Sequence, residues 1–286
     1  MIGQVNLMNA LNRLIQQGDF PRFCIFVGAA GSGKKLLASN VANKLSDIVI
    51  NVGIKADDIR DMIESAYRLT STCVYIIADA DSMSLAAKNA LLKVTEEPPN
   101  STYFIMTLQD ENRTLDTIKS RGAIFHMERY TPIEIESYAG KEFGQNKDIP
   151  IYQALCENIG EVEKLHSYNV KDFYSYVKLV VDNIATVSGA NSFKIGDRIN
   201  FKDDTEKYDF KLFLRAFMSV CMDNATRLLE EGSADSLSKM NLYLNWERIT
   251  SKYLQELGIN GINKSATFDC WLLDIREVAF NGPPGS

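Results

Sequence analysis

A glycine-rich segment near the N-terminus has the residue types and the spacing that bind phosphate. From Gly28 onward it reads Gly-Ala-Ala-Gly-Ser-Gly-Lys, which fits the pattern Gly-x-x-x-x-Gly-Lys. An apolar run predicted as a strand precedes it, and a helical pattern follows it. In that setting backbone N–H groups and the positive end of a helix surround a phosphate, and the Lys34 ammonium reaches its outer oxygens. The candidate nucleotide-binding residues of this segment are Gly28, Gly31, Ser32, Gly33, Lys34 and Lys35.

The last of these residues, Lys35, stands where such a loop normally carries Ser or Thr. That hydroxyl is a ligand of Mg²⁺, whereas an ammonium has no lone pair to offer and repels the cation. Two interpretations remain open. Lys35 helps to neutralise phosphate with little metal, or it pairs with a nearby carboxylate in a loop that stays empty. Both predict inefficient hydrolysis, with ATP or ADP as the candidate ligand and a poor fit for Mg²⁺.

A second acidic element points the same way. The apolar run Val74–Ile77, predicted as a strand, is followed by Ala78-Asp79-Ala80-Asp81. In a hydrolysing site, an Asp-Glu pair at this place holds the metal and orients the attacking water. Here Ala78 takes the place of the Asp and Asp79 the place of the Glu, so Asp79 joins the candidate nucleotide-binding residues. The alternative is that Asp79 and Asp81 only cap the strand and begin the next turn.

Apolar periodicity places these residues in an α/β domain. Over the first 130 residues, short apolar runs alternate with amphipathic helical segments, which indicates a parallel sheet covered on both faces. Five strands are predicted, at Phe23–Val27, Ile48–Val52, Val74–Ile77, Tyr103–Thr107 and Ala123–Met127. The predicted helices are 4–17, Lys34–Leu45, Asp57–Tyr67, Ser84–Thr95 and Leu115–Lys119.

After Pro132 the strand signals stop and the pattern is helical. A polar stretch, Ser188–Lys207, is rich in Gly, Asn, Asp and Lys, which is typical of a linker or an exposed loop. The predicted helices are two or three short ones within 132–168, followed by 170–186, 208–231, 239–257 and 267–280. The expected domains are a phosphate-loop domain at 1–130, a small helical domain at 131–187 and a helical C-terminal domain at 188–286.

The bulk composition excludes several classes of protein. With 45% hydrophobic and 24% charged residues, the chain of 286 residues has the composition of a globular protein. No apolar run approaches the ~20 residues that span a bilayer, and no basic-then-apolar leader is present, so we expect a cytoplasmic protein without membrane contact. A net charge of −6 argues against a protein that coats nucleic acid by itself.

The cysteines do not form a metal-binding or disulfide pattern. Five are scattered along the chain, none in a Cys-x-x-Cys pair, and each lies in an apolar context. We therefore predict buried, reduced thiols and no zinc site.

Two further motifs lie downstream of the acidic element. Ala86–Pro99 reads Ala-Ala-Lys-Asn-Ala-Leu-Leu-Lys-Val-Thr-Glu-Glu-Pro-Pro, and Thr117–Arg121 reads Thr-Ile-Lys-Ser-Arg. Together with Ile2–Gln4 and Ile54–Arg60, they resemble the clamp-loader subunits of the AAA+ class, most closely the delta-prime family of bacterial DNA polymerase III. The resemblance covers residues 1–130, and beyond residue 190 only compatible helices are seen.

The resemblance implies an AAA+ phosphate-loop domain, a small helical lid at 131–187 and an all-α collar at 188–286. It further implies a hetero-oligomeric arc with other clamp-loader subunits, which opens a sliding clamp and places it on primed DNA within the DNA polymerase III holoenzyme. In such arcs the Arg of Ser-Arg-Cys acts in trans on a neighbour's γ-phosphate, so Arg121 is the candidate arginine finger. The alternative is a surface arginine that caps the C-terminus of a helix.

Several positions depart from the family pattern. Gly122 replaces the Cys after the finger, Gln109 falls on the sensor position usually held by Asn, and Glu163 falls on the lid's sensor Arg, beside Lys164. The family's cysteine-based zinc module is absent. These losses describe a degenerate ATP site beside an intact finger, as in a stator-type subunit. Two lysines on the predicted helix after the acidic element are candidates for DNA contact or for simple solvation: Lys88 and Lys93.

Three functions therefore remain in competition. The first is a clamp-loader stator that does not hydrolyse ATP itself and supplies an arginine finger to a neighbouring ATPase subunit. The second is an active AAA+ motor ATPase of a related clamp-loader or helicase-loader class. The third is a scaffold that never binds nucleotide.

Overall fold

The computed structural model describes residues 3–99, 102–144, 147–186, 193–201, 207–231, 233–258 and 262–281. The chain forms two compact units, of which the first consists of Met1–Tyr138 with Glu157–Gly160 and the second of Ala139–Cys156 with Glu161–Ser286. Among the described residues, no helix is both long and apolar enough to cross a membrane. The expected three-part division at residues 130 and 187 stays a prediction.

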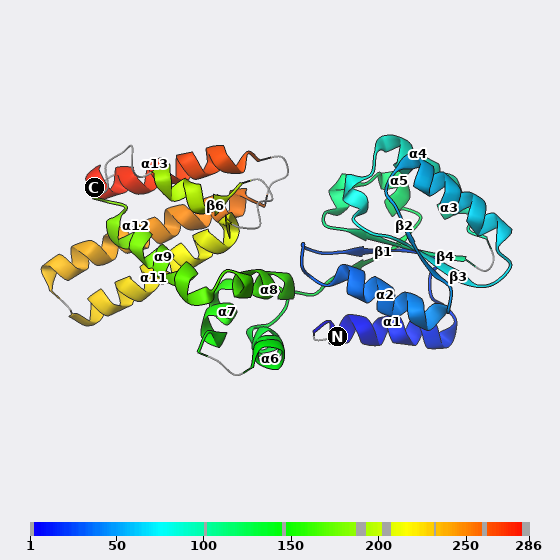
Figure 1. The fold of residues 1–286 in the computed structure, drawn as a ribbon, viewed down its shortest axis with the longest axis horizontal. Helices are drawn as coiled ribbons and strands as arrows, with labels where there is room; N and C mark the ends of the chain where they lie inside the picture. Colours follow the sequence, from blue (N-terminus) through cyan, green and yellow to red (C-terminus); the bar gives the residue numbers. More distant parts are fainter. Residues whose placement is uncertain are drawn as a thin grey trace. The chain divides into compact units, whose positions relative to one another are not determined.

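A parallel sheet of five strands forms the centre of the first unit, in the order β2-β3-β4-β1-β5 (Figure 1). Both β1 and β3 are buried along their whole length, as expected of strands covered on both faces. The predicted sheet is thereby confirmed, with small shifts of the strand ends. The strands are β1 (Phe23–Val27), β2 (Val49–Val52), β3 (Cys73–Ile77), β4 (Thr102–Leu108) and β5 (Ala123–His126).

Helices cover both faces of this sheet, with α1 and α2 on one side and α3, α4 and α5 on the other (Figure 1). Successive residues of a strand point to opposite faces, so Phe26 packs with Leu37 of α2 while Ile25 packs with Leu91 of α4. The helices are α1 (Val5–Gln17), α2 (Lys34–Leu45), α3 (Ala56–Arg68), α4 (Leu85–Glu96) and α5 (Asp116–Lys119).

The rest of the chain is mainly helical, as predicted. Helices α6 and α8 each begin in the first unit and continue into the second. The helices are α6 (Pro132–Phe143), α7 (Ile149–Leu155), α8 (Ile159–Ser167), α9 (Val170–Asn183), α11 (Phe210–Glu231), α12 (Ala234–Glu256) and α13 (Lys264–Asn281).

The predicted linker contains structure that the sequence did not indicate. A short 3-10 helix, Phe193–Arg198, leads into β6 (Ile199–Asn200), which pairs in parallel with β7 (Tyr208–Asp209). Two residues per strand are too few to show an alternating pattern, which explains why the strand signals ended at Pro132. Residues 188–192 and 202–206 of this stretch lie outside the described residues.

The cysteine prediction is correct at four positions and wrong at one. Cys24, Cys73, Cys156 and Cys221 are buried, whereas Cys270 is exposed. The apolar stripe of α13 contains Phe268, Trp271, Leu272 and Ile275. Cys270 lies off that stripe, next to the exposed Asp269.

A chain of buried hydrogen bonds joins α12 to α13. The indole of Trp271 donates to Thr250 Oγ1 at 3.0 Å, and that hydroxyl donates to the Trp246 carbonyl at 2.7 Å. The indole of Trp246 donates in turn to the Ile275 carbonyl at 2.8 Å. All three side chains are buried, so each polar group depends on its partner in this chain.

Thr250→Val should therefore destabilise the second unit by about 1–3 kcal/mol, because it leaves the buried indole N–H of Trp271 without an acceptor. The matched control is Thr226→Val on α11, since Thr226 makes the same bond to a carbonyl four residues earlier but is exposed. Chemical denaturation of both variants measures the difference. Equal unfolding free energies for the two would show that the buried chain contributes nothing.

Candidate functional site

The predicted phosphate loop connects β1 to α2 and has the backbone shape that glycine permits. Gly31 and Gly33 both have positive φ, at 79° and 85°, and Gly33 is the N-cap of α2. A side chain at either position would be strained. Left-handed residues alternating with right-handed ones turn successive N–H groups toward one concavity, which suits an anion.

Lys34 is folded into this loop. Its ammonium donates to the Ala29 carbonyl at 2.8 Å, and the residue is only 6% exposed. Burial lowers the pKa of Lys34, while the charges of Asp79 and Asp81 oppose that shift. A buried ammonium in a concavity is stabilised by a further negative group, so the position suits a phosphate oxygen.

Lys35 is paired with the acidic element. Its Nζ lies 2.5 Å from Asp79 Oδ2, and both side chains remain partly exposed, at 62% and 43%. Asp79 has a left-handed backbone with φ of 52°, and its N–H donates to Thr107 Oγ1 at the end of β4. One of the two interpretations of Lys35 was that it pairs with a nearby carboxylate, and that carboxylate is Asp79.

Asp81 has a structural task instead. Its carboxylate accepts from the backbone N–H of Gln109 at 2.7 Å and from that of Asp110 at 3.0 Å. These bonds tie the segment after β3 to the segment after β4. Gln109 at the sensor position is therefore bonded to Asp81 through its backbone N–H. The residue itself is exposed.

These residues do not fit a Mg²⁺ ion. Ala78 has no carboxylate, Asp79 is paired with an ammonium, and Asp81 already accepts amide hydrogens. Throughout the described part of the chain, no group of three or more His, Cys, Asp or Glu side chains could hold a metal ion. Mg²⁺ requires an octahedral set of oxygen ligands, which this edge of the sheet does not supply.

Two segments that the sequence did not indicate as part of the site are packed against the phosphate loop. The Gly160 N–H donates to the Gly31 carbonyl at 3.1 Å, and a Cβ at Gly31 would lie 2.5 Å from Asn158 Oδ1. The Tyr130 hydroxyl donates to the Ser32 carbonyl at 3.1 Å. The only sequence signal for this packing was a glycine on each side of the contact, because two backbones approach this closely only without side chains.

Ser32 is the residue that best supports an anion at this loop. It is 5% exposed, and among the described residues its hydroxyl has no hydrogen-bond partner. A Cβ at Gly28 would lie 2.9 Å from Ser32 Oγ, so the hydroxyl faces across the loop. A buried hydroxyl without a partner is costly, and an oxygen of a bound phosphate would satisfy it.

Arg121 follows α5 and lies against the ends of two helices. Its Nη1 donates to the Thr117 carbonyl at 2.5 Å, and its Nη2 lies 3.4 Å from Glu96 Oε2 at the end of α4. The side chain is 26% exposed. The contact with Thr117 is the helix-capping arrangement foreseen as the alternative to a finger, so the finger stays a prediction.

The residue after Arg121 is Gly122, where the resemblance predicts a cysteine, and the packing around it favours glycine. A Cβ at Gly122 would lie 2.9 Å from the ring of Phe23 and 3.1 Å from Ile25 Cδ1. A larger residue here would displace core side chains of β1, as expected for a substitution that concerns packing.

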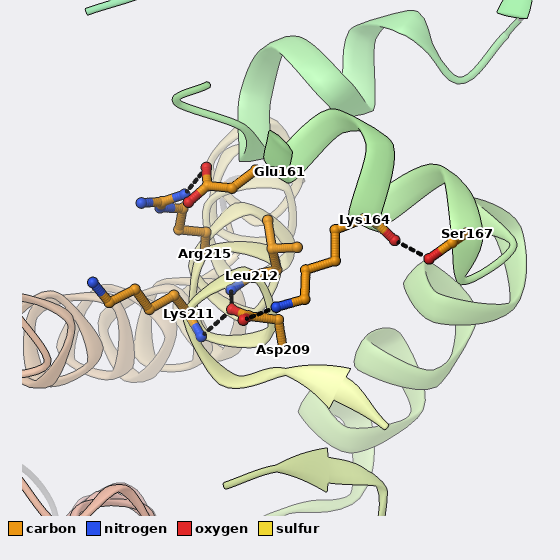
Figure 2. Close-up of polar contacts among 7 residues, drawn as sticks. All are labelled: Glu161, Lys164, Ser167, Asp209, Lys211, Leu212 and Arg215. Carbon is orange, nitrogen blue, oxygen red and sulfur yellow. Dashed lines mark hydrogen bonds and ion pairs between the residues drawn. The ribbon is translucent and has the colours of Figure 1, made fainter. Parts of the chain in front are cut away.

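The lysine beside the missing sensor arginine is already engaged. Figure 2 shows Lys164 reaching from α8 to Asp209, with Nζ 2.7 Å from Oδ2. Asp209 also caps α11 by accepting from the N–H groups of Lys211 and Leu212. Glu163 itself is exposed.

A second ion pair lies beside the first. Arg215 of α11 lies 2.7 Å from Glu161 of α8 (Figure 2). It also donates to the Leu155 carbonyl. The two pairs hold α8 to the beginning of α11. Lys164, which lies next to the position of the missing sensor arginine, thus joins helices of the second unit.

The lysines considered for DNA contact differ in their surroundings. Lys88 donates to the Arg113 carbonyl, while Lys93 is exposed on α4. A DNA-contacting role for either stays a prediction.

Comparison with known proteins relates the chain to replication proteins. The profile of the family described as "DNA polymerase III, delta subunit" matches residues 49–131. The chain is 28% identical to the DNA polymerase III subunit tau of Bacillus subtilis, over 46% of its own length and 29% of that protein. It is 22% identical to the DNA polymerase III subunit gamma of Buchnera aphidicola, over 90% of its own length and 82% of that protein.

A relative from an archaeon is also similar. The replication factor C small subunit of Halobacterium salinarum is 25% identical, over 44% of this chain and 42% of that protein. The chain thus spans less than half the length of the Bacillus and Halobacterium relatives.

Among solved structures, RuvB of Thermotoga maritima, described as a Holliday junction branch migration motor, has a similar fold. The TM-score is 0.50 at 19% identity, covering 83% of this chain and 85% of that one. At this identity the likeness concerns the fold alone.

Because of the ion pair between Lys164 and Asp209, the free energy of unfolding should depend on pH in the acidic range. Burial alone would raise the pKa of Asp209, but the hydrogen bond and charge of Lys164 and the N–H groups of α11 outweigh it and lower that pKa. A lowered pKa means that the stabilisation is present above the ordinary value of 3.8 and is lost as the pH falls through the folded value.

Asp209→Asn should lower the unfolding free energy at pH 7 by about 1 kcal/mol, a figure reduced for the partial exposure of both side chains. It should also flatten the loss of stability below about pH 4. Denaturation across pH measures both effects. Asp57→Asn, which breaks an exposed pair with Arg60, is the control and should change little. An unchanged acid profile for Asp209→Asn would contradict the assignment.

Proposed function

We propose that this chain, an AAA+ protein of the clamp-loader type, is a clamp-loader subunit of a DNA replication machine and acts there as a stator. It keeps a nucleotide site without hydrolysing ATP and presents Arg121 to the ATP of a neighbouring subunit. Support comes from the family match over residues 49–131 and from relatives named as DNA polymerase III gamma and tau subunits and as replication factor C.

The observation that carries the stator assignment is the ion pair between Lys35 and Asp79. Phosphoryl transfer in P-loop proteins needs a metal, held in part by the Ser or Thr hydroxyl, and a residue that orients the attacking water. Here the hydroxyl is replaced by an ammonium, and that ammonium neutralises the carboxylate left to orient water. The substitution thus removes the metal-binding hydroxyl, and the ion pair engages the carboxylate that would orient the water.

Arg121 is the group proposed to act on a neighbour. A guanidinium is always charged and matches phosphate oxygens in a bidentate manner. Its present partners are a carbonyl and a carboxylate 3.4 Å away whose side chain is 63% exposed. The carboxylate partner lies on the exposed side of the pair and at a long distance, so a neighbour's phosphate could replace it as the partner of the guanidinium.

The remaining roles follow from this assignment. Residues 131–187 serve as the lid and 188–286 as the collar that joins other clamp-loader subunits into an arc. The arc acts on a sliding clamp and on primed DNA. The exposed apolar side chains of the described helices in the C-terminal region are consistent with subunit contact, and they include Leu179, Met222, Leu229, Leu244, Leu273 and Phe280.

One observation favours the scaffold as a second candidate. Gly31 already has its carbonyl bonded to Gly160 and its Cα packed against Asn158. A loop covered in this way can be held by the protein itself, without nucleotide. The two candidates differ in whether ATP binds the isolated chain.

Arg121→Ala should lower the ATP turnover of the assembled complex at least tenfold, because an arginine finger contributes ~10³–10⁵ in rate in related systems. The control is Glu96→Gln, which removes the ion pair but keeps the guanidinium and should preserve turnover. A second control is Arg68→Ala, which removes an exposed arginine paired with Glu64.

Steady-state ATPase assays of the reconstituted complex measure these rates. If Glu96→Gln lowers turnover as much as Arg121→Ala, the arginine acts by joining helices and not as a finger. Unchanged turnover in Arg121→Ala would overturn the stator assignment.

The isolated chain should show no Mg²⁺-dependent ATP turnover above background. Lys35→Thr should not create it, because Ala78 still lacks the carboxylate that would hold the metal. Phosphate release at saturating ATP measures both proteins. Clear Mg²⁺-dependent turnover by the wild-type chain, raised further in Lys35→Thr, would instead support the motor ATPase.

A further inference from the structure

The first turn of α2 and the end of β3 hold a positive charge between them. Lys35 extends from α2, and its Nζ lies 2.5 Å from Asp79 Oδ2. In P-loop proteins, Mg²⁺ is held by the hydroxyl that Lys35 replaces and by an acid at the position of Ala78, next to Asp79. The chain therefore carries its own cation beside the place where others bind a metal ion.

We propose that this loop binds the phosphates of a nucleoside di- or triphosphate without a divalent metal, with the Lys35–Asp79 pair in place of Mg²⁺. The inference rests on the nucleotide site of the proposed function, and it is independent of the role of Arg121.

The ammonium of Lys35 can donate hydrogen bonds to a phosphate in addition to its contact with Asp79. It carries three N–H groups, of which Asp79 Oδ2 takes one, and its side chain is 62% exposed. Asp79 is fixed by its backbone bond to Thr107, so it holds the ammonium beside the phosphate loop. The remaining N–H groups can donate to phosphate oxygens.

The loop supplies further groups for an anion. Ser32 presents a buried hydroxyl that has no partner among the described residues. Lys34 presents an ammonium that donates to a carbonyl of the loop itself, and phosphate is a stronger acceptor than a neutral carbonyl. The N-terminus of α2 adds about half a positive charge.

A metal ion would weaken this arrangement. Mg²⁺ at the same place would be repelled by the ammonium, and Asp79 would have to leave Lys35 to bind it. Metal bound to the nucleotide also neutralises charge that Lys34 and Lys35 would otherwise contact. Affinity for the metal-free nucleotide should therefore equal or exceed affinity for its Mg²⁺ complex.

Isothermal titration of the full chain with ATP, and separately with tripolyphosphate, tests the proposal in EDTA and in excess Mg²⁺. Wild-type chain should bind in EDTA with a Kd equal to or lower than the Kd in Mg²⁺. Lys35→Thr should bind at least tenfold more weakly in EDTA, and Mg²⁺ should recover part of that loss through the restored hydroxyl.

The matched control is Lys44→Thr, the same change of charge in the last turn of the same helix, where the lysine is exposed and bonds to Asn12. It should bind like the wild type in both conditions. Thermal melting of each variant without ligand should match the wild type, which separates a loss of binding from a loss of fold.

Two results would overturn the proposal. One is wild-type affinity that rises tenfold or more on adding Mg²⁺. The other is no binding of ATP or tripolyphosphate in either condition, which would support the scaffold. Neither result bears on Arg121, because its test is the turnover of a neighbouring subunit.

Discussion

The parallel pairing of β3, β4, β1 and β5 is the constraint on which the candidate site depends. Parallel strands have their carboxyl ends at the same edge, so the segments that follow them meet there. The phosphate loop follows β1, the acidic element follows β3, and Gln109 follows β4. Residues between positions 28 and 109 of the sequence become neighbours because one sheet aligns the ends of its strands.

At this edge the charges are balanced within the chain. The ammonium of Lys35 faces the carboxylate of Asp79, and the carboxylate of Asp81 faces two backbone N–H groups. A hydrolysing site would leave such carboxylates to a metal and a water. The same fold can therefore carry different arrangements of charge at this edge, and the difference lies in a few side chains.

The positions that depart from the family pattern share a physical character. Gly122 has core side chains within contact of any Cβ, and Gln109 is held by its backbone. Lys164, the neighbour of the departing Glu163, is bonded to the residue that caps α11. At each of these places the residue packs against, or forms a hydrogen bond with, other residues of the same chain. The residues at these places therefore serve the protein's internal structure.

The sequence by itself determined the sheet, nearly all of the helices, the phosphate loop and the unusual residue within it. These features can be predicted from short stretches of sequence. A strand buried on both faces is apolar throughout, and a glycine-rich loop between a strand and a helix is recognised without any distant partner. Local patterns also have limits, as the exposed Cys270 and the two-residue strands β6 and β7 show.

Only the tertiary structure decided which groups meet. Asp79 was one of two acids available to Lys35, and the choice depends on the turn after β3, where Asp79 adopts a left-handed backbone and Asp81 faces β4. The contact of Asn158 and Gly160 with Gly31, and that of Lys164 with Asp209, join segments far apart in the chain. Spacing along a chain does not encode such contacts, because they arise from how whole elements pack.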